Sequence, residues 1–168
     1  ISRALAHDGG WTITGAKSLA IDAPVAGKLI VSARTSGAES DPSGVSLFIV
    51  DAAAAGLRMQ TMRTQDNRRA ADLVFDSVRV AAGALLGAEG GAHDALVEAL
   101  DFATVLCCAE AVGAMRSANA ATLEYLKTRR QFGVPIGTFQ ALQHRLVDLY
   151  VSAEQARSIT LQIGRAHV

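Results

Sequence analysis

The residues best suited to chemistry lie together at positions 129–144. There, two arginines precede a phenylalanine and a Gly/Pro break, and glutamines follow. Arginine can hold a phosphate through two parallel hydrogen bonds, an aromatic ring can stack on a base, and glutamine both donates and accepts hydrogen bonds. Together these groups could hold a nucleotide-type ligand. Arginines in the last turn of a helix also favour its negative end, so the residues alone favour the simpler alternative of a capped helix corner.

Composition and charge exclude several other functions. Half of the 168 residues are apolar and 19% are charged, which is typical of a globular chain. Sixteen basic residues balance sixteen acidic ones, so no overall field would attract nucleic acid or an anionic membrane. No apolar run is long enough to span a bilayer, and the four histidines are too scattered to indicate a metal site.

The two cysteines, Cys107 and Cys108, are adjacent in the sequence. Vicinal cysteines rarely pair with each other, and they lack the spacing of zinc ligands. We therefore expect a reduced, cytoplasmic chain in which both cysteines are small buried residues. Because the sequence begins with Ile1 rather than methionine, we also expect it to be a piece of a longer protein.

The first half of the chain, up to about residue 88, predicts strands. Runs rich in Val, Ile, Leu and Phe alternate with turn residues. Asp8, Gly9 and Gly10 predict a hairpin, because glycine accepts a positive φ without penalty. No helical crossover separates the strands, so we expect an antiparallel barrel or sandwich. The expected strands are 2–6, 11–14, Lys28–Arg34, Val45–Asp51, 57–62 and 72–80.

After the glycine-rich stretch 87–91 the pattern becomes helical. Residues 92–129 are rich in alanine and carry apolar residues at helical spacing. Gly133 and Pro135 end this helix, and Thr138 is expected to cap a second one. Two long helices with such large apolar faces need further helices to cover them. The predicted fold class is therefore α+β, with a β-barrel or sandwich domain (1–88) followed by the long antiparallel helices of an incomplete four-helix bundle (89–168).

Several segments in the same order resemble the acyl-CoA dehydrogenase family. RRQFGVPI at 129–136, with FQA at 139–141 and QHRLVD at 143–148, is similar to the family pattern R-x-Q-F-G-x-P-I-x-x-F-Q-A-x-Q-H-x-L-A-D. GWTITGAK at 10–17 resembles G-W-x-L-x-G-x-K, and VFDSVRV at 74–80, followed by LLG, resembles F-D-x-V-x-V-P…L-L-G. Linked motifs in order are more specific than any one alone, and the resemblance extends over nearly the whole chain.

This resemblance implies a fold and an activity. The chain would contain the middle β-barrel and the first two helices of the C-terminal bundle, with FAD between them and shared across a dimer within a homo- or heterotetramer. The implied reaction is the FAD-dependent α,β-dehydrogenation of an acyl-CoA thioester. A carboxylate removes the α-proton while the flavin accepts the β-hydride. An electron-transfer flavoprotein or a similar acceptor would then take the electrons.

The resemblance also implies roles for residues of the corner. Arg129 would contact the FAD pyrophosphate of the neighbouring subunit, with Gln131 as a polar helper. Phe132 would lie beside the adenine, and Gly133 would allow the chain to turn there. Gln140 would be a further contact on the adenosine side.

Two positions expected near the flavin ring depart from the family pattern. Leu19 replaces an aromatic residue, and Ile21 replaces a threonine whose hydroxyl would donate a hydrogen bond near the flavin. On the helix, Asp101 would face the CoA arm of the substrate, and Thr104 replaces a common arginine. Tuning of the flavin at this face is therefore expected to differ.

The resemblance assigns no catalytic residue to this chain. Ala103 occupies the position where a minority of the family carries its glutamate base. The more common base would follow Val168, and the flavin loop with Gly-Ser-Asp would precede Ile1. We therefore expect the 168 residues alone to be inactive.

Residues 65–71 leave the kind of enzyme open. They resemble the D-x-T-R-R-x-A segment of a branch that acts on branched, sterol-derived or otherwise unusual acyl-CoAs. Members of that branch often form heterotetramers in which one subunit type has lost the base or FAD contacts. The alternatives are thus such a partner subunit, or a flavin oxidase or monooxygenase of the same fold. Arg68 and Arg69 could equally be solvated loop residues.

Overall fold

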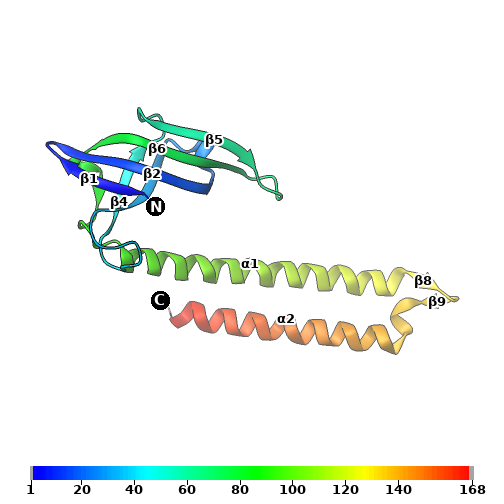
Figure 1. Ribbon diagram of the computed structural model, residues 1–168. Helices are drawn as coiled ribbons and strands as arrows, with labels where there is room; N and C mark the ends of the chain where they lie inside the picture. The colour runs from blue at the N-terminus through cyan, green and yellow to red at the C-terminus, as the bar shows by residue number, and fades with distance from the viewer. Residues whose placement is uncertain (1, 167–168) are drawn as a thin grey trace. The chain divides into compact units, whose positions relative to one another are not determined.

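The structure, a computed structural model, describes residues 2–166 in two compact units, Ile1–Val97 and Glu98–Val168. The first unit contains the sheet, and the second contains most of helix α1 together with α2 (Figure 1). The α+β class predicted from the sequence is confirmed.

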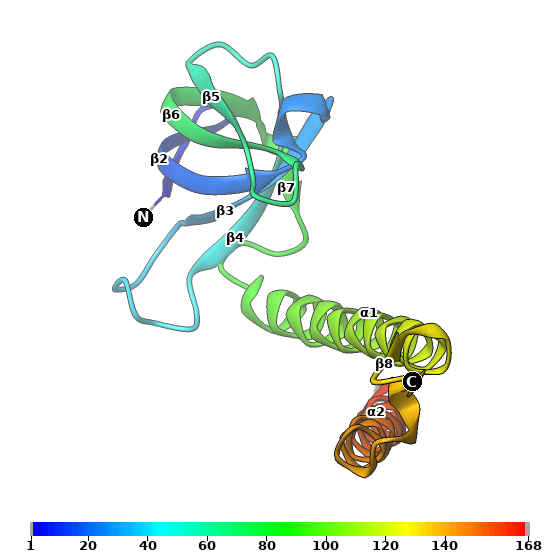
Figure 2. The same cartoon turned by 90° about the vertical axis from the view of Figure 1, so that its right-hand side faces the viewer.

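The first unit is one sheet that curls on itself (Figure 2). Its seven strands follow the order β5-β6-β2-β1-β3-β4-β7. One expectation is wrong, because the sheet is mixed rather than antiparallel. The consecutive strands β2 and β3 are not neighbours; β1 lies between them and runs parallel to β3, with Arg3 opposite Arg34. The strands are β1 (Arg3–His7), β2 (Gly10–Ile21), β3 (Lys28–Arg34), β4 (Val45–Asp51), β5 (Leu57–Arg63), β6 (Arg69–Ala81) and β7 (Leu85–Leu86).

The hairpin predicted at Asp8 and Gly9 is confirmed. His7 pairs with Gly10, and Gly9 adopts a φ of 89°, which a residue with a Cβ adopts only at a cost. Strands β2 and β6 run further than expected, and the short β7 was not expected at all. The long pairing between β2 and β6 contains a register shift between Lys17 and Ala20, so that β2 bulges near Leu19.

The core of the sheet comes from alternate residues of the strands. Phe48, Phe75, Ile13, Val50 and Val78 are fully buried. Burying each such side chain contributes about 1.5–3 kcal/mol relative to leaving it exposed. These buried side chains explain why runs rich in Val, Ile, Leu and Phe located the strands.

Buried Arg34 organises the loop that follows β3. Its guanidinium donates hydrogen bonds of 2.8–3.1 Å to the carbonyl oxygens of Ser36, Glu39, Asp41 and Ser43. Four carbonyl acceptors compensate the charge for most of the hydration it loses on burial. The loop is therefore an ordered part of this unit.

The second unit is a pair of antiparallel helices joined by a small hairpin, and both views show the helices side by side (Figures 1 and 2). The predicted long helix is confirmed. Thr138 is not a helix cap: it ends the 3-10 turn η3, and its hydroxyl donates to the Pro135 carbonyl at 2.8 Å. The elements are α1 (His93–Thr128), β8 (Arg130–Gln131), β9 (Val134–Pro135), η3 (Ile136–Thr138) and α2 (Gln140–Ala166).

The helices leave many apolar side chains exposed. The expectation of buried cysteines is therefore wrong: Cys107 is exposed and Cys108 is half-buried, because α1 has only α2 beside it in this unit. Both thiols are free. Among the described residues, no helix has the length and hydropathy needed to cross a membrane.

Candidate functional site

The corner between α1 and α2 is a two-residue β-hairpin. Arg130 pairs with Pro135 and Gln131 with Val134, so that the turn consists of Phe132 and Gly133. Their φ angles are 53° and 81°, both left-handed, as a type I′ turn requires. For a phenylalanine this conformation costs about 1–2 kcal/mol.

The strained turn presents an aromatic ring to solvent. Phe132 is 90% exposed, and its ring meets Phe139 edge-on, with centroids 6.1 Å apart and planes at 83°. Arg130 donates from Nη2 to the Gly133 carbonyl at 2.9 Å, and Gln131 donates from Nε2 to the Arg130 carbonyl at 2.9 Å. The side chains of Arg130 and Gln131 thus stabilise the hairpin, while the ring of Phe132 stays exposed to solvent.

Arg129 stands at the base of this hairpin with a fixed backbone and a free side chain. Its N–H donates to the Tyr125 carbonyl and its carbonyl accepts from the Ile136 N–H, both at 2.8 Å. The side chain is exposed, and within residues 2–166 it forms no ion pair. A guanidinium of this kind remains available to bind an anion in a bidentate way. Gln140, the first residue of α2, is also exposed and follows Phe139 directly.

The two remaining predicted cofactor contacts, Leu19 and Ile21, belong to the sheet unit. Leu19 is 54% exposed and Ile21 is 39% exposed. Leu19 has a φ of 52°, and its N–H donates to Oδ1 of Asp72 at 2.8 Å. Leu19 therefore shares with Phe132 the rare combination of a large apolar side chain, a left-handed backbone and exposure to solvent.

A pocket of 480 Å³ adjoins this part of β2. Lys17 lines it, half-buried, and donates from Nζ to Oγ of Ser32 at 3.0 Å. Burial lowers the pKa of the Lys17 ammonium, because the charged form loses hydration. Ala20 and Ile21 of β2 and residues 28–32 of β3 form most of the remaining wall.

Asp101 and Thr104, the predicted substrate contacts, lie three residues apart on α1, and both are exposed. The Thr104 hydroxyl donates to the Leu100 carbonyl at 2.8 Å, as threonines in helices commonly do. Residues three apart share a helix face. The Asp101 carboxylate is therefore the freer of the two to meet a ligand.

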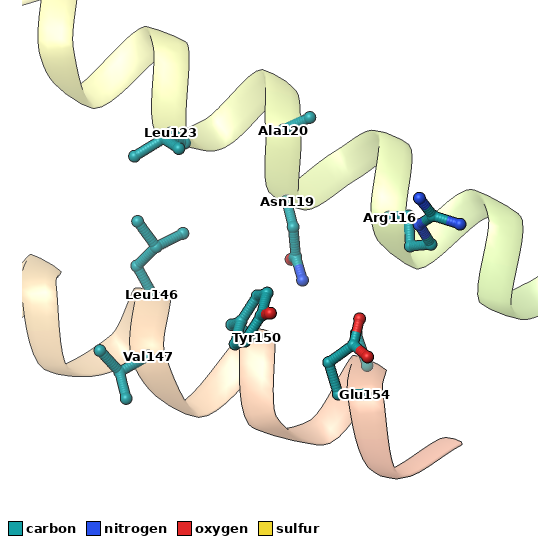
Figure 3. A pocket seen from close by; sticks show the side chains of 9 residues that line it. Arg116, Asn119, Ala120, Leu123, Leu146, Val147, Tyr150 and Glu154 are labelled. Carbon is teal, nitrogen blue, oxygen red and sulfur yellow. The ribbon is translucent and has the colours of Figure 1, made fainter. Parts of the chain in front are cut away.

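Sequence reasoning missed a pocket of 570 Å³ between α1 and α2. Arg116 and Asn119 approach it from α1, and Tyr150 and Glu154 approach it from α2 (Figure 3). Asn119 also donates from Nδ2 to the Leu149 carbonyl at 3.2 Å, which ties the two helices together. The signal in the sequence was weak: polar residues such as Arg116 and Asn119 interrupt an alanine-rich stretch.

Comparison with known protein families shows to which family this chain belongs. The model described as acyl-CoA dehydrogenase, middle domain, matches residues 2–78, and the one described as acyl-CoA dehydrogenase, C-terminal domain, matches residues 89–167. The chain belongs to the acyl-CoA dehydrogenase family.

Relatives within the acyl-CoA dehydrogenase family have several substrates. The chain is 31% identical over 161 residues to the mitochondrial 2-methylacyl-CoA dehydrogenase of Solanum tuberosum, covering 94% of this chain and 39% of the relative. It is 35% identical over 153 residues to the L-prolyl-[peptidyl-carrier protein] dehydrogenase of Pseudomonas fluorescens, covering 89% and 40%. The chain thus spans about two fifths of the length of these relatives.

Solved acyl-CoA dehydrogenase structures share the fold. Butyryl-CoA dehydrogenase from Megasphaera elsdenii superposes with a TM-score of 0.89 at 28% identity, covering 96% of this chain and 43% of that one. A complex of glutaryl-CoA dehydrogenase with glutaryl-CoA gives a TM-score of 0.88 at 26% identity, covering 96% and 42%.

The corner residues fit the adenosine diphosphate part of the FAD that this family implies. The exposed guanidinium of Arg129, which forms no ion pair in the described part of the chain, suits a pyrophosphate, and an exposed ring at Phe132 suits an adenine face. On the sheet, Leu19 and Ile21 offer apolar surface to a flavin ring, but neither side chain can donate a hydrogen bond.

Arg68 has a local partner, which favours the solvated-loop alternative for it. Its Nη2 lies 2.9 Å from Oδ2 of Asp22, and both side chains are more than half exposed. Exposed ion pairs contribute little, so Arg68→Ala should lower the free energy of unfolding by less than about 1 kcal/mol. Denaturant titration of the full-length protein measures this, with Arg69→Ala as the neighbouring control. A larger loss would show that Arg68 has a further role.

Proposed function

We propose that the full-length protein catalyses the FAD-dependent α,β-dehydrogenation of an acyl-CoA thioester. The observation that carries this proposal is the corner hairpin. There the ring of Phe132, which is exposed and has a left-handed backbone, lies on the turn, and the exposed guanidinium of Arg129, which forms no ion pair among residues 2–166, lies at the base of the hairpin. Family membership indicates the chemistry that FAD would supply when bound, namely acceptance of the β-hydride of the thioester.

In the proposed enzyme, residues of this chain bind and orient the FAD. Arg129 holds the pyrophosphate, Phe132 covers the adenine, and Gln140 bonds the adenosine, all on FAD of the neighbouring subunit. Gly133 lets the chain reverse tightly enough to expose Phe132. Because Arg130 already donates to the Gly133 carbonyl within the hairpin, Arg129 is the one of the two arginines that is assigned to the pyrophosphate.

Fewer residues of this chain are assigned to the acyl-CoA substrate. Asp101 faces the CoA arm, and Thr104 lines the same helix face. Ala103 carries no ionisable group, so the base that takes the α-proton is proposed to come from another part of the full-length protein. We further propose a cytoplasmic tetramer that passes its electrons to an electron-transfer flavoprotein or a similar acceptor.

A second candidate is a partner subunit that assembles with an active one. The observation that favours it is Ile21, which cannot donate a hydrogen bond to a flavin from its exposed position on β2. In that case the subunit would bind FAD weakly or not at all, and its corner would serve a flavin bound to the partner.

Purification of the full-length protein separates these candidates. A yellow tetramer of one chain type that reduces an artificial electron acceptor with acyl-CoA supports the dehydrogenase. A colourless protein that gains activity only when co-expressed with a second chain supports the partner subunit. Hydrogen peroxide formation with dioxygen as the only electron acceptor would instead indicate an oxidase.

A further inference from the structure

The pairing between β2 and β6 contains two irregularities that cancel. The first places one extra residue on β6, between Phe75 and Val78, where Ser77 has a φ of 54°. The second places one extra residue on β2, between Lys17 and Ala20, where Leu19 has a φ of 52°. The original register is thus restored at Ala20, and each extra residue forms a β-bulge.

The bulge on β2 decides which side chains point outward. Before it, Ile13 is fully buried and Lys17 is half-buried, so odd-numbered residues point inward. After it, Ala20 packs against the core while Ile21 is exposed. Successive strand residues alternate between faces, and a shift by one residue exchanges the faces. Without the extra residue, Leu19 and Ile21 would point inward with Lys17.

Asp72 is the residue opposite the bulge. Leu73 pairs with Lys17 and Ala71 pairs with Ala20, so Asp72 faces the two residues between them and has no cross-strand partner on β2. Its carboxylate oxygen Oδ1 accepts from the Leu19 N–H at 2.8 Å. This bond replaces the ladder bond that the bulge removes and satisfies the amide of the left-handed residue.

We propose that Asp72 is a positioning residue, whose carboxylate holds the β2 bulge and thereby keeps Leu19 and Ile21 on the exposed side of the sheet. That these two side chains then face a flavin ring rests on the proposed function. The bulge itself does not rest on it. A side chain from the neighbouring strand thus determines the surface that β2 presents to its ligand.

Two substitutions of Asp72 in the full-length protein test this. Asp72→Val favours a strand and removes the acceptor, whereas Asp72→Asn keeps an acceptor oxygen in the same place. Amide hydrogen exchange at Leu19, measured without flavin or substrate, should accelerate at least tenfold in Asp72→Val and stay near the original rate in Asp72→Asn. Unchanged exchange in Asp72→Val would overturn the proposal. If Asp72→Val does not fold, Asp72→Ser, which is too short to reach the same position, gives the same comparison.

Bound flavin gives a second reading that a merely structural role would not change. Its absorbance spectrum and midpoint potential, measured per bound flavin, should shift in Asp72→Val and return in Asp72→Asn. Asp76→Ala is the matched control, because it removes another carboxylate of β6, one that is exposed and paired with Arg58 of β5. It should change neither the absorbance spectrum nor the midpoint potential. Altered exchange with an unaltered flavin would uphold the bulge but refute its link to the flavin. Failure of flavin binding in every variant and in the unmodified protein would contradict the proposed function alone.

Discussion

Arg129→Ala in the full-length protein should weaken FAD binding by about 10- to 100-fold. A charge-assisted bond to a phosphate contributes about 1.5–3 kcal/mol, and each 1.4 kcal/mol corresponds to a factor of ten. The Arg129 side chain has no ion-pair partner among the described residues, so its removal leaves no buried charge behind. The loss should therefore appear in binding and leave the free energy of unfolding nearly unchanged.

The measurement is flavin occupancy after gel filtration, followed by titration of the apoprotein with FAD. Arg145→Ala removes an exposed arginine from α2 and serves as the control for charge alone. Arg129→Lys tests the geometry, because an ammonium keeps the charge but cannot bind in a bidentate way, and it should bind FAD with intermediate affinity. Equal occupancy in Arg129→Ala and Arg145→Ala would show that Arg129 does not hold the pyrophosphate.

The sequence located the corner but not its structure. Helical periodicity sustained over many residues predicted α1 nearly to its ends, and Gly133 and Pro135 marked the break. The hairpin was missed because a type I′ turn is recognised by Asn, Asp or Gly at its first position, and here that position is Phe132. Thr138 looked like a helix cap because the hairpin and the 3-10 turn that precede α2 were not predicted.

In the sheet, the strands were predictable and their register was not. Runs rich in Val, Ile, Leu and Phe predicted β3 and β4 with their observed ends. On β2 the small and polar residues at 15–18 interrupt the run of β-forming residues, so the strand looked shorter than it is. The bond that holds the bulge joins Leu19 to Asp72, 53 residues away, and no local pattern in the sequence indicates such a pairing.

Phe132→Asn should stabilise the protein and weaken FAD binding at the same time. Asparagine tolerates the left-handed conformation that Phe132 adopts, and Asn-Gly is a favoured pair for a type I′ turn. Relief of this strain should raise the free energy of unfolding by up to about 1 kcal/mol, reduced by the lost contact with Phe139. Loss of an aromatic ring stacked on a base typically costs about 1–3 kcal/mol of binding.

This variant is decisive because stability should rise while FAD affinity falls. A residue that only shapes the turn would change the free energy of unfolding and the FAD affinity in the same direction. Denaturant unfolding of the apoprotein measures the first quantity, and titration with FAD measures the second. Phe132→Tyr keeps a ring at the same φ and should leave the stability and the FAD affinity nearly unchanged. Phe139→Leu removes only the ring that Phe132 contacts edge-on. If Phe132→Asn gained stability and bound FAD as tightly as the unmodified protein, the exposed ring would have no part in the cofactor site. The strain at the corner would then need another explanation.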